Sequence, residues 1–181
     1  MFMNLNIFSR PCLLCIRFLG RNYREGFYVR EIAKLLHIGL GSASMCLKEL
    51  KGEGLLVQER RGRLVIYRAD VHNPLLREFK ILFTLAELSP LTRDLSALSS
   101  RIILFGSCAS GEDTDESDAD LLIETEEARG TEAVLREHSR NMERKVSPVI
   151  LTPREFRALR EKDRPLQERI LKGRVLHERS A

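Results

Sequence analysis

Four residues between positions 106 and 120 have the types and the spacing to bind a metal-bound phosphate. Gly106 and Ser107 follow a short apolar run, and Asp118 and Asp120 come after ten further residues. Glycine lets backbone N–H groups approach a phosphate closely, because it has no Cβ. We therefore expect Gly106 and Ser107 to hold the phosphates of ATP or another nucleoside triphosphate. Paired carboxylates supply hard oxygen ligands, so Asp118 and Asp120 are the expected ligands of Mg²⁺ or Mn²⁺.

Two predicted strands position these groups. Residues 102–105 are apolar and end at the glycine, which is the pattern of a buried strand feeding a tight turn. Residues 119–123 form a second apolar run beside the acidic pair. Side chains two residues apart on a strand leave the same face, so both carboxylates are expected to point to one side.

Two other interpretations of this stretch compete. The acids at 112, 113, 115 and 116 are expected to be solvated surface residues, but a solvated loop leaves the Gly-Ser turn and the paired aspartates unexplained. A calcium loop is the second alternative, and its EF-hand positions would be filled by Asp113, Asp115, Ser117 and Glu124. The sixth position of that loop is Asp118, where the turn needs glycine, and the flanks have the pattern of strands.

The stretch as a whole resembles the signature of the polymerase-beta-like nucleotidyltransferases in their minimal form. The shared pattern is Gly-Ser, ten residues and Asp-x-Asp. The finer pattern is met by Ala109, Gly111, Ser117 and Leu121. The resemblance implies transfer of a nucleoside monophosphate from a nucleoside triphosphate. It also implies a catalytic role for Asp118 and Asp120, and adds Ser117 to the nucleotide-binding residues.

The third carboxylate that active members of this family use is not found at its expected place. That acid lies on a later strand and helps to activate the attacking hydroxyl. The corresponding strand here, residues 145–151, has no acid, and Ser147 stands about where it is expected. We therefore expect a domain that binds Mg²⁺ and nucleotide with weak or no transfer activity. Substitutes for the third acid could come from Glu124, Glu126 and Glu155.

The front half has a different organisation. Ser9-Arg10-Pro11 predicts the start of a helix, and residues 26–29 are expected to form a short strand. Two more helices are expected at residues 30–36 and 40–52, followed by a hairpin whose strands are residues 55–59 and 64–68. This order resembles the winged helix-turn-helix of arsenic-repressor-like and multiple-antibiotic-resistance-like regulators. Because those families are characteristically dimeric, the resemblance implies a homodimer that binds double-stranded DNA.

The third helix and the hairpin carry the side chains expected to contact DNA. Short polar and cationic groups can enter a major groove, and arginines at a hairpin tip can reach phosphates or a minor groove. The predicted DNA-binding residues are Ser42, Ser44, Lys48, Lys51, Arg60, Arg61 and Arg63. Residues 1–70 hold 12 lysines and arginines against 6 acids, whereas residues 71–181 hold 18 against 20. A basic front half suits a polyanionic partner, although a winged helix used only for protein packing remains an alternative.

The resulting hypothesis is a DNA-binding transcriptional regulator that carries a nucleotide-binding domain. One alternative is an active transferase that adenylates a protein, a tRNA or a small-molecule hydroxyl. In minimal family members paired with a HEPN-type toxin, the transferase modifies that toxin, so the resemblance implies such a partner and an antitoxin role. Another alternative is a DNA-binding protein whose back half is a vestigial module for packing or dimerisation.

The predicted fold class is α+β. It comprises an N-terminal winged helix-turn-helix domain over 1–70, a helical connector over 71–99, and a small α/β nucleotidyltransferase-fold domain with a mixed sheet over 100–181. The connector is expected to contain a helix at 75–88, ended by Ser89-Pro90, and a short helical piece to 98. Beyond the motif we expect a helix at 131–143, a strand at 146–151, a helix capped by Thr152 and Glu155, a helix at 164–172 and a strand at 174–177.

The remaining composition indicates a cytoplasmic protein. No apolar run reaches the length of a membrane span, and arginines interrupt the apolar start, which argues against a signal peptide. Cys12 and Cys15 form a lone CxxC pair with no second pair at zinc spacing. We therefore expect these residues, with Cys46 and Cys108, to be buried reduced thiols.

Overall fold

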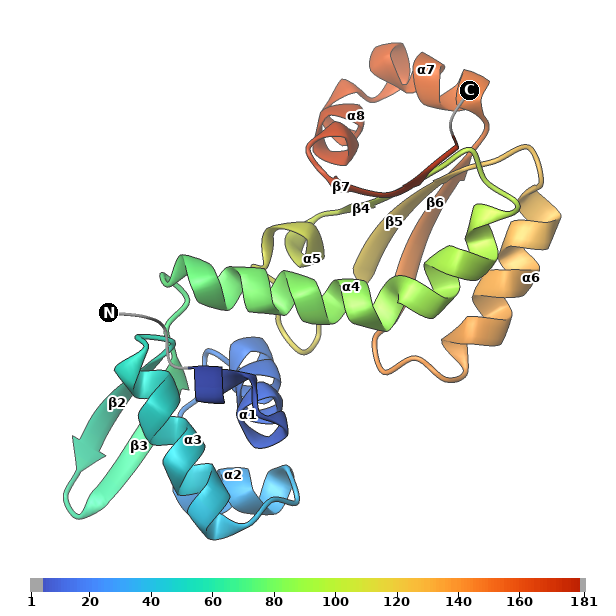
Figure 1. Cartoon of the computed structure of the whole chain (residues 1–181). Coiled ribbons are helices and arrows are strands. Elements are labelled where there is room, and N and C mark those ends of the chain that lie inside the picture. Colours follow the sequence, from blue (N-terminus) through green and yellow to red (C-terminus); the bar gives the residue numbers. More distant parts are fainter. Residues whose placement is uncertain (1–4, 180–181) are drawn as a thin grey trace. The chain divides into compact units, whose positions relative to one another are not determined.

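The front unit consists of helices around a small antiparallel sheet (Figure 1). The structure, a computed structural model, describes residues 5–179. The elements in order are η1 (Leu5–Phe8), α1 (Arg10–Arg21), β1 (Phe27–Tyr28), α2 (Val29–Leu35), α3 (Leu40–Gly52), β2 (Leu56–Arg61) and β3 (Leu64–Ala69). Strand β3 lies between β1 and β2, and the β2–β3 hairpin turns at Gly62, whose positive φ of 63° suits glycine.

The helices of the front unit bury a shared apolar core. Each helix has a stripe of apolar residues on one side, and burying that stripe supplies most of the stability of such a unit. The fully buried side chains include Ile16, Leu19, Ile32, Leu47 and Leu50. The predicted burial of all four cysteines is confirmed. Burial raises the pKa of Cys15 and of Cys46 to about 12, which keeps these thiols protonated and unreactive at neutral pH.

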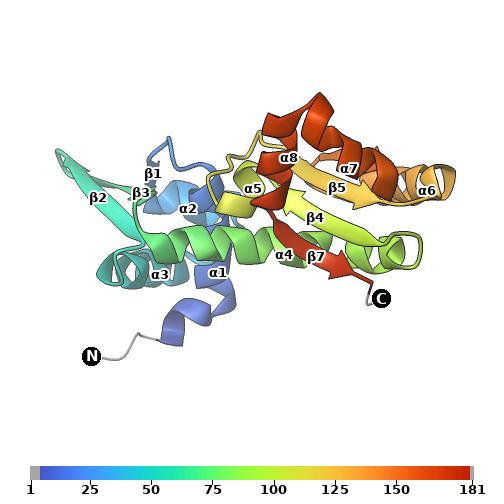
Figure 2. The ribbon, with the colours of Figure 1, turned by 90° about the horizontal axis from the view of Figure 1, so that it is seen from above.

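The back unit is built on a four-stranded mixed sheet. Its strands are β4 (Arg101–Phe105), β5 (Ala119–Glu124), β6 (Val146–Leu151) and β7 (Arg174–Glu178). The order across the sheet is β6-β5-β4-β7, and Figure 2 shows β4 between β5 and β7. Strand β4 is antiparallel to both of its neighbours, whereas β5 and β6 are parallel. The α+β class and the mixed sheet predicted for the back half are confirmed.

Helices cover both faces of this sheet (Figure 1). They are α4 (Pro74–Ser96), the short α5 (Ser107–Ser110), α6 (Ala128–Ser139), α7 (Pro153–Lys162) and α8 (Arg164–Leu171). Alternate strand residues face opposite sides. Ile102, Leu104 and Leu121 pack on the side of α4 and α6. Ile103, Phe105 and Leu122 pack on the side of α7 and α8.

Helix α4 continues through the position where the sequence predicted a break. Pro90 lies inside α4, although an interior proline lacks a hydrogen-bond donor and costs about 3 kcal/mol. Leu88, Leu91 and Leu95 are almost fully buried around it. Each buried leucine contributes about 1.5–3 kcal/mol, so their packing outweighs the cost of the proline. The prediction of two separate helical pieces was wrong for this reason.

Helix α6 also differs from its predicted bounds. It begins at Ala128 and ends at Ser139, whereas the sequence predicted residues 131–143. Thr131 was taken for a helix start, but its side chain is fully buried within α6. The predicted caps further along are confirmed: Thr152 and Glu155 form a capping box at α7, and Asp163 accepts a hydrogen bond from the N–H of Leu166 at α8.

The chain divides into two compact units, residues 1–80 and 81–181, with the division inside α4. The predicted boundaries at 70 and 100 stay predictions. Among the described residues, no helix combines the length and the apolarity needed to cross a membrane.

Candidate functional site

The Gly-Ser turn at the end of β4 adopts a backbone that only glycine tolerates. Gly106 has φ 72° and ψ −157°, a region that is essentially closed to residues with a Cβ. A Cβ built at this position would also overlap the Oδ2 atom of Asp120. The turn and the second aspartate of the motif are therefore in direct contact.

Asp120 stands at the centre of this arrangement. It is paired in register with Phe105 on β4 and with Ser147 on β6. By strand alternation it shares a face with Leu122, which is the face covered by α7 and α8. Partial burial raises the pKa of Asp120, while the Arg169 charge and a hydrogen bond from Ser147 lower it less, and the charge of Asp118 raises it further.

Asp118 lies one residue before β5 and is more open. Its side chain is 40% exposed, and its Oδ2 atom is 3.9 Å from the Nζ atom of Lys145. Such an exposed pair contributes little energy, so the carboxylate stays available to a ligand. The electrostatic effect of Asp118 on Asp120 shows that the two charges are near each other. Two neighbouring carboxylates fit one hard divalent cation.

No third acid joins this pair within residues 5–179. Ser147 occupies the position opposite Asp120 and donates its hydrogen bond there. Glu124 is bound by Arg101 at 2.8 Å, and Glu155 is held in the capping box of α7. Glu126 is exposed, two residues after the end of β5. Among the described residues no group of three acidic, histidine or cysteine ligands forms a metal site.

A cavity of about 650 Å³ opens beside the Gly-Ser turn. It lies between the start of α5 and the junction of α8 with β7, and is lined by Gly106, Ser107, Ala109, Ser110, Glu112, Arg169, Lys172, Gly173 and Arg174. The charged residues of this lining are three cations, Arg169, Lys172 and Arg174, and one acid, Glu112. The lining therefore has an excess of positive charge, which attracts anions. Gly173 is required at this junction, because a Cβ would overlap the carbonyl oxygen of Leu104.

The cations of this cavity were missed by sequence reasoning. Arg169 lies in the last turn of α8, and its guanidinium is 5.8 Å from the ring centre of Phe105. Lys172 and Arg174 flank Gly173, where the chain enters β7. All three cations lie more than sixty residues after Gly106 in the sequence, so no local pattern linked them to the turn. The packing of α8 against β4 and the pairing of β7 with β4 bring them to the turn.

The loop between the turn and the aspartates is more ordered than a solvated acidic segment. Asp113 is almost fully buried and pairs with Arg144 at 2.8 Å. The prediction that all four acids of this loop are surface residues was therefore wrong for Asp113. The hydroxyl of Ser117 accepts a hydrogen bond from the N–H of Thr114 at 2.9 Å, so it closes the loop. Because Asp113 and Glu124 are each bound by an arginine, the calcium-loop alternative is not supported.

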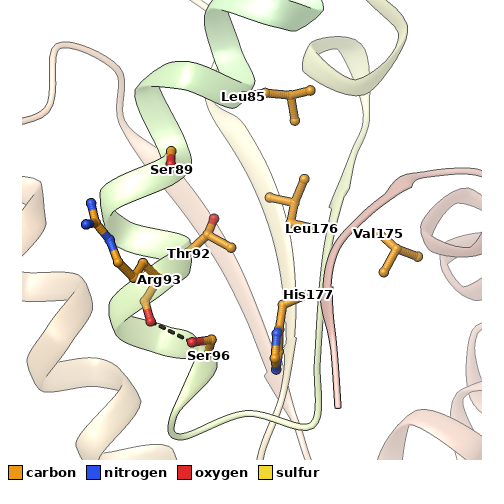
Figure 3. A pocket seen from close by; sticks show the side chains of 8 residues that line it. All are labelled: Leu85, Ser89, Thr92, Arg93, Ser96, Val175, Leu176 and His177. Atoms are coloured by element: carbon orange, nitrogen blue, oxygen red, sulfur yellow. Dashed lines mark hydrogen bonds between the residues drawn. The ribbon is translucent and has the colours of Figure 1, made fainter. Parts of the chain in front are cut away.

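Another cavity of the back unit, about 510 Å³, lies between α4 and β7 (Figure 3). Leu85, Leu176 and His177 lie between these elements, whereas the guanidinium of Arg93 is directed away from them. None of the motif residues and no carboxylate line this cavity. Of these two cavities, only the one at the Gly-Ser turn is lined by motif residues, Gly106 and Ser107 among them, whereas Asp118 and Asp120 line neither.

In the front unit, the residues predicted to contact DNA differ in exposure. Lys48 and Lys51 are exposed on α3, whereas Ser42 and Ser44 are half-buried. The hairpin arginines, Arg60, Arg61 and Arg63, are all exposed. Arg61 is bound to Glu59 at 3.0 Å. Leu40 and Met45 expose about half of their surface on α3, so apolar groups lie among the cations.

Comparison with known proteins gives a match for the back half. Residues 99–181 match the family model described as polymerase beta, nucleotidyltransferase. No match was found among curated proteins, and none among solved structures. The matched range contains the Gly-Ser turn, both aspartates and the cationic cavity. Residues 99–181 therefore form a domain of the polymerase beta nucleotidyltransferase family.

Proposed function

We propose that the back unit binds a nucleoside triphosphate together with one divalent cation. The observation that supports this most directly is the contact between the Gly106 turn and the carboxylate of Asp120, beside a cavity rimmed by Arg169, Lys172 and Arg174. Polyphosphates need positive charge and closely approaching N–H groups, and both are available at this turn.

Asp118 and Asp120 would hold the cation. Their carboxylates are the ligand type that Mg²⁺ and Mn²⁺ prefer, and Asp118 is open enough to accept an ion. A bound cation would neutralise phosphate charge beside the turn and stabilise the negative charge that develops at phosphorus. Burial raises the pKa of Asp120, so the cation and protons would compete for this carboxylate as the pH falls.

Transfer of a nucleoside monophosphate is proposed to be weak or absent. A serine at position 147 cannot serve as the third acid that would hold a second ion or accept the proton of an attacking hydroxyl. Its hydroxyl instead stabilises the charged form of Asp120. The site is therefore better suited to holding a nucleotide than to turning it over.

The front unit is proposed to bind double-stranded DNA as a winged helix-turn-helix. The order of α2, α3 and the β2–β3 hairpin supports this, as does the exposure of Lys48, Lys51, Arg60 and Arg63. Together the two units would make a DNA-binding regulator that carries a nucleotide-binding domain. A homodimer would present two such surfaces to a two-fold symmetric site.

Calorimetric titration of the full chain with ATP and Mg²⁺ tests the nucleotide proposal. We expect saturable binding that is lost in Asp118→Ala and in Asp120→Ala. Asp115→Ala is the matched control, since it removes an exposed acid from the same loop and should leave binding unchanged. Equal binding by all four proteins would reject the proposed site.

Incubation with labelled ATP distinguishes this proposal from an active transferase. We expect no label on protein, tRNA or small hydroxyl acceptors above the level of Asp120→Ala. Turnover that requires both aspartates would instead establish the transferase, including one directed at a HEPN-type toxin. Absence of any Asp-dependent binding would leave a back half that serves only packing or dimerisation.

A further inference from the structure

Arg144, just before β6, forms an ion pair that is buried in the back unit. Its side chain is 3% exposed, and the side chain of its partner Asp113 is 1% exposed. The Nη2 atom of Arg144 lies 2.8 Å from the Oδ2 atom of Asp113. Removing two charges from water costs several kcal/mol per ion, and an apolar pair of similar volume is often equally stable. The energy of folding therefore does not account for this pair, and its geometry suggests another role.

The guanidinium of Arg144 contacts both ends of the loop that precedes the paired aspartates. Besides Asp113, it donates to the carbonyl oxygen of Ser117 at 2.7 Å and to the Sγ atom of Cys108 at 3.1 Å. The thiol of Cys108 in turn donates to the carbonyl oxygen of Asp118 at 3.3 Å. One planar group thus fixes the backbone directly before Asp118 and, through Cys108, the backbone of Asp118 itself.

The backbone around Arg144 is anchored in turn. Its N–H donates to the Oε1 atom of Glu87 on α4 at 3.1 Å. The carbonyl oxygen of Lys145, the next residue, accepts from the N–H of Ala119 at 2.9 Å. Arg144 therefore stands at a fixed point between α4 and the start of the β5–β6 pairing, from which its side chain can hold the loop.

We propose that Arg144 is the positioning residue of the cation site. Its guanidinium holds the loop at residues 112–117 so that the carboxylate of Asp118, whose Oδ2 atom lies 3.9 Å from the Nζ atom of Lys145, stays beside Asp120. The role in cation binding rests on the function proposed above, whereas the ordering of the loop does not. A lysine cannot replace the arginine, because a single ammonium cannot reach three acceptors in a plane.

Arg144→Lys in the full chain tests this role with two independent measurements. Hydrogen–deuterium exchange without ligand should become faster in the peptide that covers residues 112–119, and remain unchanged in β4. Mn²⁺ affinity, measured by the electron paramagnetic resonance of the free ion, should fall by roughly 10- to 100-fold, the usual effect of losing a group that orients a metal ligand. Arg140→Lys, an exposed position after α6, is the control and should alter neither.

The double variant Asp113→Leu/Arg144→Met separates positioning from folding. It removes both charges together, so the back unit should unfold at a temperature close to that of the wild type. Loop exchange should still rise and Mn²⁺ affinity should still fall. Wild-type exchange and wild-type affinity in both Arg144 variants would overturn the proposal. Wild-type protein that binds neither Mn²⁺ nor nucleotide would instead reject the proposed function, and loop exchange would then still decide whether Arg144 holds the loop.

Discussion

Replacement of Ser147 by aspartate should make the back unit dependent on a divalent cation. Ser147 faces Asp120 across the parallel β5–β6 pair and donates a hydrogen bond to its carboxylate. Ser147→Asp exchanges that donor for a second negative charge. It also supplies the acid that the family pattern places on this strand. The change therefore destabilises the site without a cation and completes it when a cation binds.

The size of the stability loss follows from two changes: the hydrogen bond from Ser147 to Asp120 is lost, and a repulsion between two carboxylates is added. A hydrogen bond to a charged acceptor contributes about 1.5–3 kcal/mol. Two carboxylates about 4 Å apart repel by about 4 kcal/mol at an effective dielectric constant of 20, and partial exposure and proton uptake reduce this value. We expect a net loss of roughly 2–4 kcal/mol without metal, which lowers the Tm of the back unit by roughly 10–20 °C.

Thermal unfolding with chelator and with Mn²⁺ measures both effects. A cation at one hundred times its dissociation constant stabilises the folded state by about 2.7 kcal/mol, so Mn²⁺ should restore most of the lost Tm. The control Ser147→Asn places a side chain with the shape of aspartate but without its charge at this position. Mn²⁺ should raise the Tm of this variant no more than it raises the Tm of the wild type. Labelled ATP should reveal transfer above the wild-type level in the aspartate variant alone. An aspartate variant with unchanged Tm, or with a Tm that ignores Mn²⁺, would refute the assigned facing of Asp120 and Ser147.

Three further outcomes are expected. Gly106→Ala forces a side chain into a glycine-only backbone region and against Asp120, which costs about 1–3 kcal/mol and should abolish ATP binding in the calorimeter. Because burial raises the pKa of Asp120, protons should displace Mn²⁺ at a higher pH than at an ordinary aspartate, and Arg169→Ala should move this loss to still higher pH in a titration series. Arg60→Ala/Arg63→Ala should weaken DNA binding and reduce the salt dependence of log K by about 0.9 per lost phosphate contact, whereas unchanged slopes in a gel-shift series would exclude the hairpin.

The site residues that lie close together in the sequence were predictable from it. Gly106 and Asp120 carry their signal within one strand–turn–strand segment, because the turn chemistry and the strand period are local properties. The strand at 146–151 was found in its full length, since a mainly apolar run of this length is typical of a strand. In the structure, the contact between Gly106 and Asp120 results from the antiparallel pairing of β4 with β5, which the sequence had not specified.

The remaining features depend on tertiary structure. Pro90 was expected to end a helix, but burial of the surrounding leucines outweighs the local preference. Asp113 was expected on the surface, because its partner Arg144 lies thirty-one residues away. Arg169 reaches the site only through the packing of α8 over β4 and the pairing of β7 beside it. Sequence reasoning has no means to weigh such distant pairings from one chain.

The arrangement around Asp120 favours a ligand-binding back unit over one that serves only packing. A partly buried carboxylate with a raised pKa destabilises a fold, since an apolar or neutral side chain would fill the same place at lower cost. The backbone of Gly106 is likewise strained for any other residue, and it brings the chain against that carboxylate. A packing module gains nothing from either feature. A bound cation would compensate the first feature, because it neutralises Asp120, and the missing Cβ lets that carboxylate approach the turn where a polyphosphate would bind.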